Sequence, residues 1–310
     1  VRASHLYKVF GKHEREVIER LKAGESREDL ASLGTAAVID VSFEVAKGET
    51  FVVMGLSGSG KSTLIRMING LWAPSEGTVE VAGKVVSDMN DAQLRELRRD
   101  HVSMVFQHFA LLPHLTVREN AAYGLKLQGK LKPKDRLEKA NEWLHTVGLK
   151  GWGDKYPHQL SGGMQQRVGL ARALAAETDI LLMDEAFSAL DPLIRREMQD
   201  QLLELQSTLN KTIIFITHDL NEAMYLGDHI AVMRNGRVAQ IGTSDEILTQ
   251  PADDYVADFV QDVDRSRVLT ASAVMRPTEA IVSKSADPRQ VQRIMDQHDW
   301  AGVFVVDEHR

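Results

Sequence analysis

The sequence contains no cysteine, which excludes disulfide bonds and thiolate metal ligands and suits a reducing compartment such as the cytosol. It also has no run approaching the roughly 18 apolar residues that a membrane-spanning helix needs. The first residues, VRASHLYKVFGKHERE, hold no apolar signal core, so we expect no secretion signal there. Because residue 1 is a valine, we expect further residues upstream. If the protein works at a membrane, other chains must hold it there.

An excess of positive charge is absent too, because 37 lysine and arginine residues face 44 aspartate and glutamate residues, for a net charge of -7. Binding to duplex nucleic acid depends on a basic surface, so nucleic acid is not expected as the main partner. Hydrophobic residues make up 43% of the chain and charged residues 26%, which is typical of a globular protein with a core. A length of 310 residues allows one large domain and a smaller unit.

Short apolar runs that alternate with amphipathic helices predict an α/β fold, built on a parallel sheet with right-handed crossovers. DILLMDE (179–185) and KTIIFITHD (211–219) have the apolar centres and polar ends of central parallel strands. The other predicted elements are strands at 4–10, 36–45 and 49–54, a helix at about 61–71, and hairpins at 78–86 and 229–242 with turns at Ala82-Gly83 and Asn235-Gly236.

Helical patterns dominate two further segments. An insert at about 12–34 predicts two short helices, with Ser26 and Asp29 as a capping box, and the segment at about 91–177 is mostly helical, with a capping box in LTVREN. Asp191 and Pro192 predict the cap and first residue of another helix. Beyond residue 264 the character changes, and 265–310 predicts one helix and two short strands, too little for a large independent core.

GLSGSGKST, residues 55–63, fits the pattern G-x-x-x-x-G-K-[ST] and lies between a buried strand and a helix, as a phosphate-binding loop should. Its glycines let the backbone wrap a phosphate with N–H groups pointing inward. Lys61 supplies a positive charge for the β- and γ-phosphates, and Ser62 supplies a hydroxyl for Mg²⁺. The alternative is a plain glycine- and serine-rich turn, which the motif and its context disfavour. The residues expected to bind the nucleotide are Gly55, Ser57, Gly58, Ser59, Gly60, Lys61, Ser62 and Thr63.

ILLMDE, residues 180–185, is the usual partner of such a loop, because four apolar residues lead to acids at a strand end. Asp184 is expected to hold Mg²⁺, directly or through water. Glu185 is then free to orient and polarise the attacking water. Two acids at a strand end could also be a solvated edge or a helix cap, but the neighbouring phosphate loop argues against that reading. Together the two motifs predict a P-loop NTPase that uses ATP and Mg²⁺.

Four further motifs resemble those of ATP-binding-cassette (ABC) ATPases and appear in the order and spacing of that family. LSGGM (160–164) resembles their signature sequence, Gln107 in VFQHFALLPH their Q-loop, SALD (188–191) their D-loop, and His218 their switch histidine. The resemblance covers about residues 4–260. It implies an ABC nucleotide-binding domain over 1–264, with a RecA-like parallel-sheet core, an antiparallel β subdomain and a helical signature subdomain at about 91–177.

The resemblance also implies that a second copy completes each nucleotide site. Ser161, Gly162 and Gly163 would offer hydroxyl and N–H groups to the γ-phosphate of an ATP bound by the partner, backed by a helix N-terminus. Asp191 would contact the opposite subunit in addition to capping its own helix. The expected arrangement is therefore a homodimer with ATP sandwiched at its interface.

Two catalytic roles and one adenine contact follow from the same resemblance. Gln107 would be a ligand of the metal and the water, and His218 would contact the γ-phosphate, with a satisfied buried histidine as the alternative. Phe10 in LYKVFG falls where the family places an aromatic that stacks on adenine. Tyr7 is the competitor, and core packing is the alternative for both.

The insert, together with FALLPH and MDEAFSALDPLIR, resembles the ATPase subunit of bacterial importers for quaternary amines such as glycine betaine and proline betaine, with trimethylamine N-oxide, choline or carnitine left open. The implied partners are two membrane-spanning permease subunits, which would place the chain peripherally at the cytoplasmic face of the plasma membrane, and a periplasmic or lipid-anchored substrate-binding protein. The groove beside Gln107 would receive a short helix of the permease, unless Phe109, Leu111 and Leu112 are ordinary core. The segment 265–310 resembles an incomplete CBS module.

Two other functions stay open at this point. A soluble ABC ATPase of DNA repair or translation would carry two cassettes, a coiled-coil insertion or a basic surface, none of which is evident. A P-loop kinase acting on a small molecule would not need the signature motif or the acid pair.

Overall fold

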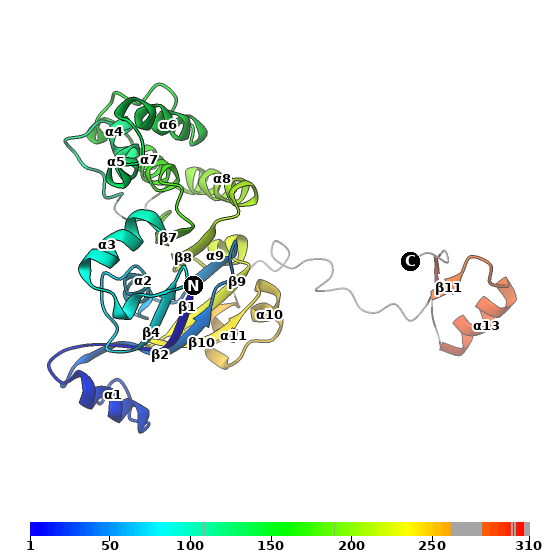
Figure 1. Cartoon of the computed structure of the whole chain (residues 1–310). Coiled ribbons are helices and arrows are strands. Elements are labelled where there is room, and N and C mark those ends of the chain that lie inside the picture. The colour runs from blue at the N-terminus through cyan, green and yellow to red at the C-terminus, as the bar shows by residue number, and fades with distance from the viewer. Residues whose placement is uncertain (108, 189, 262–280, 299, 301, 307–310) are drawn as a thin grey trace. The chain divides into compact units, whose positions relative to one another are not determined.

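The computed structural model describes residues 1–107, 109–188, 190–261, 281–298, 300 and 302–306. The chain divides into two compact units, Val1–Val268 and Leu269–Arg310. The first unit combines two sheets with a group of helices (Figure 1). Among the described residues, no helix is long and apolar enough to span a bilayer.

A six-stranded sheet forms the centre of the first unit. Its order is β10-β9-β3-β8-β7-β6, and all neighbours are parallel except the β9–β10 hairpin. Every residue of β3, β7 and β8 is buried, which confirms the prediction of central parallel strands. The turn of the hairpin is Asn235-Gly236, as predicted. The strands are β3 (Thr50–Met54), β6 (Val102–Val105), β7 (Ile180–Asp184), β8 (Thr212–Thr217), β9 (His229–Arg234) and β10 (Arg237–Gly242).

A four-stranded antiparallel sheet, ordered β2-β1-β4-β5, contributes to the same core. Its strands are β1 (Arg2–Phe10), β2 (Thr35–Glu44), β4 (Glu76–Val81) and β5 (Lys84–Val85). Helix α2 (Lys61–Ile68) lies between the sheets, since its buried side chains belong to one cluster with residues of both. The phosphate loop is therefore held between the two sheets, at the start of α2.

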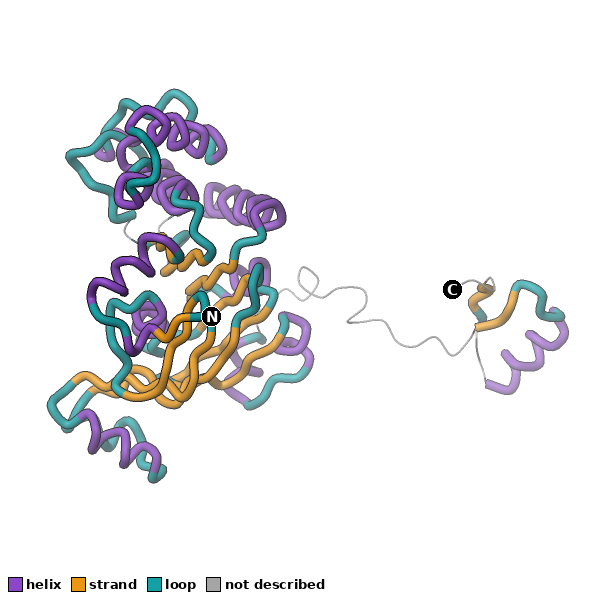
Figure 2. The backbone as a smooth tube through the Cα atoms, in the orientation of Figure 1, coloured by secondary structure: helices purple, strands orange, loops and turns teal. Residues whose placement is uncertain are grey.

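A group of helices lies apart from the strands in Figure 2. Thr116 begins α4 with the predicted capping box, in which its hydroxyl accepts from Glu119 N and the Glu119 carboxylate accepts from Thr116 N. One strand, β6, lies inside the segment of mostly helical pattern and was not identified from the sequence. The helices of this segment are α3 (Asp91–Asp100), α4 (Val117–Ala121), α5 (Tyr123–Gln128), α6 (Pro133–Thr146) and α7 (Gly162–Ala175), with a 3₁₀ turn at Pro157–Gln159. Another 3₁₀ turn, Val86–Asp88, precedes α3.

The last part of the first unit carries one long helix and three short ones. Helix α8 (Pro192–Leu209) begins at Pro192 with Asp191 as its cap, as predicted. The others are α9 (Leu220–Leu226), α10 (Ser244–Thr249) and α11 (Asp254–Phe259).

The insert between β1 and β2 contains one helix rather than the predicted two. Helix α1 (Glu14–Lys22) packs Val17, Ile18 and Leu21 into a small cluster with β1 and β2. The second predicted helix is wrong, because residues 27–33 form turns. The Ser26 hydroxyl nevertheless accepts from Asp29 N, and this local bond satisfies a turn as well as a helix start.

The second unit contains β11 (Ile281–Ser283), α13 (Pro288–His298) and β12 (Phe304–Val306), with the two strands paired in parallel. This confirms the predicted helix and two short strands. The proposed domain boundary at residue 264 lies outside the described residues, and the resemblance of this unit to a CBS module stays a prediction.

Candidate active site

The phosphate loop, residues 55–60, joins the buried strand β3 to α2 and depends on its glycines. Gly55 and Gly60 have φ values of +146° and +104°, which glycine adopts without strain. A Cβ added at Gly60 would lie 2.2 Å from the Ala37 carbonyl oxygen, and one at Gly55 would lie 2.3 Å from that of Met233. The loop is thus packed directly against the backbones of β2 and β9, and its shape is set by that contact.

Lys61 is folded over this loop. Its side chain is only 4% exposed, and its Nζ donates to the carbonyl oxygens of Gly55 (2.8 Å) and Leu56 (3.1 Å). Burial lowers the pKa of Lys61, while the carboxylates of Glu185 and Asp184 act in the opposite direction. The ammonium group is therefore held inside the loop, close to two acids and without a direct ion pair to either.

Ser62 and Asp184 bring two oxygen atoms together. Ser62 Oγ, in the first turn of α2, donates to Asp184 Oδ1 at 3.1 Å, at the carboxyl end of β7. Asp184 is buried, which raises its pKa. A hydroxyl and a carboxylate fit Mg²⁺, which takes oxygen ligands and completes its shell with phosphate and water.

Glu185 lies at the centre of a second cluster. Its Oε2 accepts from Gln107 Nε2 at 3.2 Å and lies 3.2 Å from His218 Nδ1. Glu185 itself has a left-handed backbone, with φ at +46°, a conformation that costs energy for a residue with a side chain and is concentrated at functional sites. The three side chains follow β6, β7 and β8, which are adjacent and parallel, so their carboxyl ends meet at one edge of the sheet.

The residues expected to meet the partner's nucleotide, Ser161–Gly163 and Asp191, line a cavity separate from the phosphate loop. Ser161 caps α7, with its Oγ accepting from Met164 N at 3.3 Å, and Asp191 caps α8, with its Oδ1 accepting from Ile194 N at 3.1 Å. They line one open cavity of about 590 Å³ that includes none of the phosphate-loop residues. The cavity is lined by Gly148, Leu149, Trp152, Ser161, Gly162, Gly163, Met164, Arg167, Leu190, Asp191 and Ile194.

Phe10, at the end of β1, keeps part of its ring free. It is 38% exposed and meets Trp72 edge-to-face, with ring centroids 5.1 Å apart. Tyr7 is 5% exposed and belongs to the cluster beneath the insert. Of the two candidate aromatics, only Phe10 has surface on which another ring could stack.

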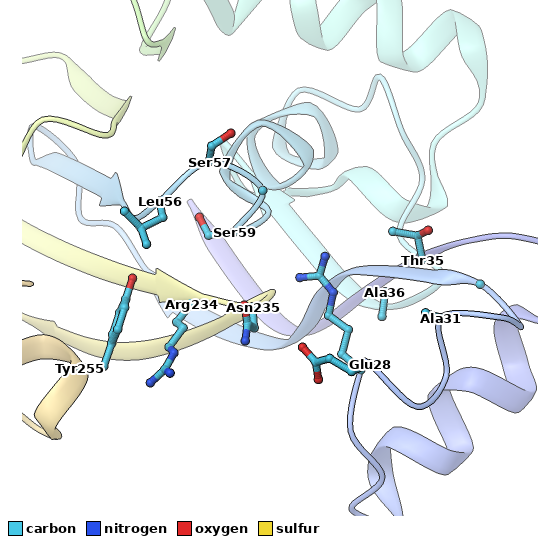
Figure 3. A pocket seen from close by; sticks show the side chains of 13 residues that line it. Glu28, Ala31, Thr35, Ala36, Leu56, Ser57, Ser59, Arg234, Asn235 and Tyr255 are labelled. Atoms are coloured by element: carbon cyan, nitrogen blue, oxygen red, sulfur yellow. The ribbon is translucent and has the colours of Figure 1, made fainter.

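Sequence reasoning missed a cavity of about 630 Å³ beside the phosphate loop (Figure 3). The insert supplies Arg27 and Glu28, the end of β9 supplies Arg234, and α11 supplies Tyr255, over whose ring the Arg234 guanidinium lies at 4.4 Å. Exposed Ser57 and Gly58 and the buried Ser59 form the wall on the loop side. No sequence motif marks these residues, because they meet only through the packing of three distant segments.

The sheet order, the phosphate loop at the start of α2 and the acids at the end of β7 define a P-loop ATPase of the ATP-binding-cassette class. The family model described as "ABC transporter" matches residues 38–188. The chain belongs to the ATP-binding proteins of ABC transporters. It is an ATPase whose ligands are ATP and Mg²⁺, and membership of this family excludes the small-molecule kinase.

Known proteins similar to the chain include two transport ATP-binding proteins. The glycine betaine/carnitine transport protein GbuA of Listeria monocytogenes is 52% identical over 313 residues, covering 100% of this chain and 78% of its own. The glycine betaine/proline betaine transport protein ProV of Escherichia coli is 49% identical over 311 residues, covering 98% of this chain and 77% of its own. A dimeric structure of the ATP-binding cassette MJ0796 bound to ADP and Pi matches with a TM-score of 0.68 at 32% identity, over 78% of this chain and 98% of that one.

Proposed function

We propose that this chain is the ATP-hydrolysing subunit of a bacterial importer for quaternary amines, and that two copies share their nucleotide sites. The observation that carries the proposal is that the phosphate loop and the cavity at Ser161 lie in separate places of one chain. The phosphate loop and the Glu185 cluster form one half, and the cavity at Ser161 forms the other.

The first half binds the nucleotide and prepares the water. The loop N–H groups, with Lys61, Ser62 and Thr63, hold the phosphates, and Phe10 stacks on the adenine. Ser62, Asp184 and Gln107 would hold Mg²⁺, which neutralises charge on the phosphate oxygens when bound. The remaining loop residues in this role are Gly55, Ser57, Gly58, Ser59 and Gly60.

Glu185 acts as the general base. Its carboxylate accepts a proton from the attacking water, while Gln107 and His218, which already contact Glu185 Oε2, keep that carboxylate and the water in line with the terminal phosphate. Because the three groups come from the ends of neighbouring strands, the sheet holds their spacing during the reaction.

The second half closes the site from the partner copy. Ser161, Gly162 and Gly163 offer their hydroxyl and N–H groups at the start of α7, where the helix end favours an anion. Leu56 in the phosphate loop is 58% exposed and Leu193 near Asp191 is 70% exposed, which supports burial of both surfaces in a dimer. The dimeric state of the related cassette MJ0796 supports the same arrangement.

Dimer closure and opening drive two permease subunits, supplied with solute by a substrate-binding protein, and the chain acts peripherally at the cytoplasmic face of the membrane. The segment after Gln107 is the proposed contact with the permease. Phe109 and Ala110 both have left-handed backbones, held by bonds from Arg172 to their carbonyl oxygens. Phe109, Leu111 and Leu112 are only partly buried, so apolar surface remains for a short permease helix.

Mixing two complementary variants tests the shared site. Lys61→Ala removes the phosphate contact but leaves the signature surface, Ser161–Gly163, intact. Gly162→Asp disrupts the signature surface but leaves the phosphate contact of Lys61. A Cβ at Gly162 meets nothing closer than 3.7 Å, so a side chain fits there without strain on neighbouring atoms. Each variant alone should be inactive, while an equimolar mixture contains mixed dimers with one complete site and should recover about a quarter of the parental rate. A mixture that stays inactive would contradict the shared site.

The solute class rests on the similarity to GbuA and ProV, whose names specify glycine betaine with carnitine or proline betaine. In vesicles containing the chain with its permease and binding protein, glycine betaine should stimulate ATP hydrolysis and glycine, which lacks the quaternary ammonium group, should not. Equal response to both compounds would contradict the proposed class.

A further inference from the structure

Arg195, in the first turns of α8, joins two loops that belong to different halves of the nucleotide site. Its Nη2 donates to the carbonyl oxygen of Leu190 at 3.2 Å, and its Nη1 donates to Asp219 Oδ2 at 3.3 Å. Leu190 lies in the SALD segment beside Asp191, and Asp219 directly follows His218. One planar guanidinium therefore connects the surface expected to meet the partner with the loop that carries the switch histidine.

Asp219, the residue that links Arg195 to the His218 loop, is held by several hydrogen bonds. Its Oδ1 accepts from Asn221 N (2.9 Å) and Glu222 N (3.3 Å) at the start of α9, and its own N–H donates to Thr217 Oγ1 (2.9 Å). Two backbone N–H groups thus hold the carboxylate, and the Thr217 hydroxyl holds the N–H of Asp219 itself. The carboxylate that Arg195 contacts is thus held next to the peptide that joins His218 to Asp219.

A second contact, one helical turn further along α8, strengthens the link. Gln199 Nε2 donates to Glu222 Oε1 at 3.1 Å, and both residues are buried. Residues four apart lie on the same face of a helix, so Arg195 and Gln199 hold the first turn of α9 together. Two side-chain contacts therefore join α8 to the start of α9.

The Arg195 side chain is kept in this position at a cost. Its Nε is buried and has no hydrogen-bond partner in the described structure, which is unfavourable for a charged donor. A partly exposed pair such as Arg195–Asp219 contributes little to stability. Stability alone therefore gives little reason to hold the side chain there.

We propose that Arg195 is a positioning residue that couples the SALD segment to His218, so that contact of Asp191 with the partner copy sets the His218–Glu185 contact. This inference rests on the proposed function. It makes dimer closure a condition for alignment of the water, in addition to a condition for completing the site.

Arg195→Gln, Asp219→Asn and the double variant test the coupling in the full chain. Asparagine keeps the cap at position 219 but loses the charge. Each single variant should lower kcat by about tenfold or more with KM for ATP changed less than about twofold, because small displacements of catalytic groups cost rate rather than binding. The double variant should be no slower than the slower single variant, and Arg195→Lys should restore little, since an ammonium lacks the two-pronged geometry.

Arg196→Gln is the matched control. Arg196 lies next in the same helix and contacts Asp200 and Tyr225 instead, so its loss should leave kcat unchanged. In a His218→Ala background, single-turnover rates should show no further loss from Arg195→Gln. An unchanged kcat in Arg195→Gln, or a full further loss in the His218→Ala background, overturns the coupling. If His218→Ala and Glu185→Gln themselves retain the parental rate, the proposed function fails instead.

Discussion

Replacing Glu185 with glutamine gives the sharpest test of the catalytic cluster. The amide has the shape of the carboxylate and leaves the left-handed backbone at φ +46° as it is. One oxygen remains to accept from Gln107, whose Nε2 now lies 3.2 Å from Glu185 Oε2. The substitution thus removes the proton acceptor and little else. General-base catalysis contributes about 10²–10⁴-fold, so kcat should fall by that factor, equal to about 3–5 kcal/mol in the barrier.

Phosphate release at saturating ATP and Mg²⁺ measures the rate, and light scattering with and without ATP measures the dimer. Glu185→Gln should lose turnover but still dimerise with ATP, since the phosphate loop and signature surface are intact. Glu177→Gln is the matched control, because Glu177 also has a left-handed backbone (φ +50°) but pairs with Lys139 at the surface. Turnover by Glu185→Gln close to that of Glu177→Gln would refute the assignment of the base.

Three further outcomes follow from the same structure. Lys61→Ala should weaken ATP binding at least tenfold, since the buried ammonium is lost from the loop, and fluorescent-nucleotide titration with undiminished affinity would contradict this. Ser161→Ala removes the cap of α7 and should cost about 1 kcal/mol in unfolding free energy. Ser161→Asp keeps a capping carboxylate but repels phosphate, so this variant should show near-parental stability in denaturant melts and no activity. Retained activity in Ser161→Asp would count against the signature role. Burial raises the pKa of Glu222, so the parent should lose stability relative to Glu222→Gln as pH rises above the usual glutamate range. The melting temperatures of the parent and of Glu222→Gln should therefore differ more at pH 8 than at pH 5. A difference independent of pH would disprove this.

The phosphate loop, the acid pair and the cap of α8 were predictable because each is encoded in a few neighbouring residues. The rule that parallel strands are buried on both faces likewise located β7 and β8 correctly. These local signals were enough for the fold class and for most of the proposed site.

The remaining features depend on contacts between distant residues. Strand β6 has only four residues, and what makes it a strand is its pairing with β7, where Val102 meets Ile180. The spacing of Ser26 and Asp29 suggested a helix, but the bond from Asp29 N to Ser26 Oγ also forms in the turns at 27–33. The Arg195 bridge and the cavity at Arg27 both join segments far apart in the chain, and no local pattern announces such meetings.

The separation of the phosphate loop from the Ser161 cavity also bears on cellular energy use. Under the proposed shared site, a single chain binds ATP without enclosing it, so subunits that are not yet assembled should hydrolyse little ATP. Two chains bound to one transporter would be held at a high effective concentration, which favours the dimer and so allows ATP hydrolysis.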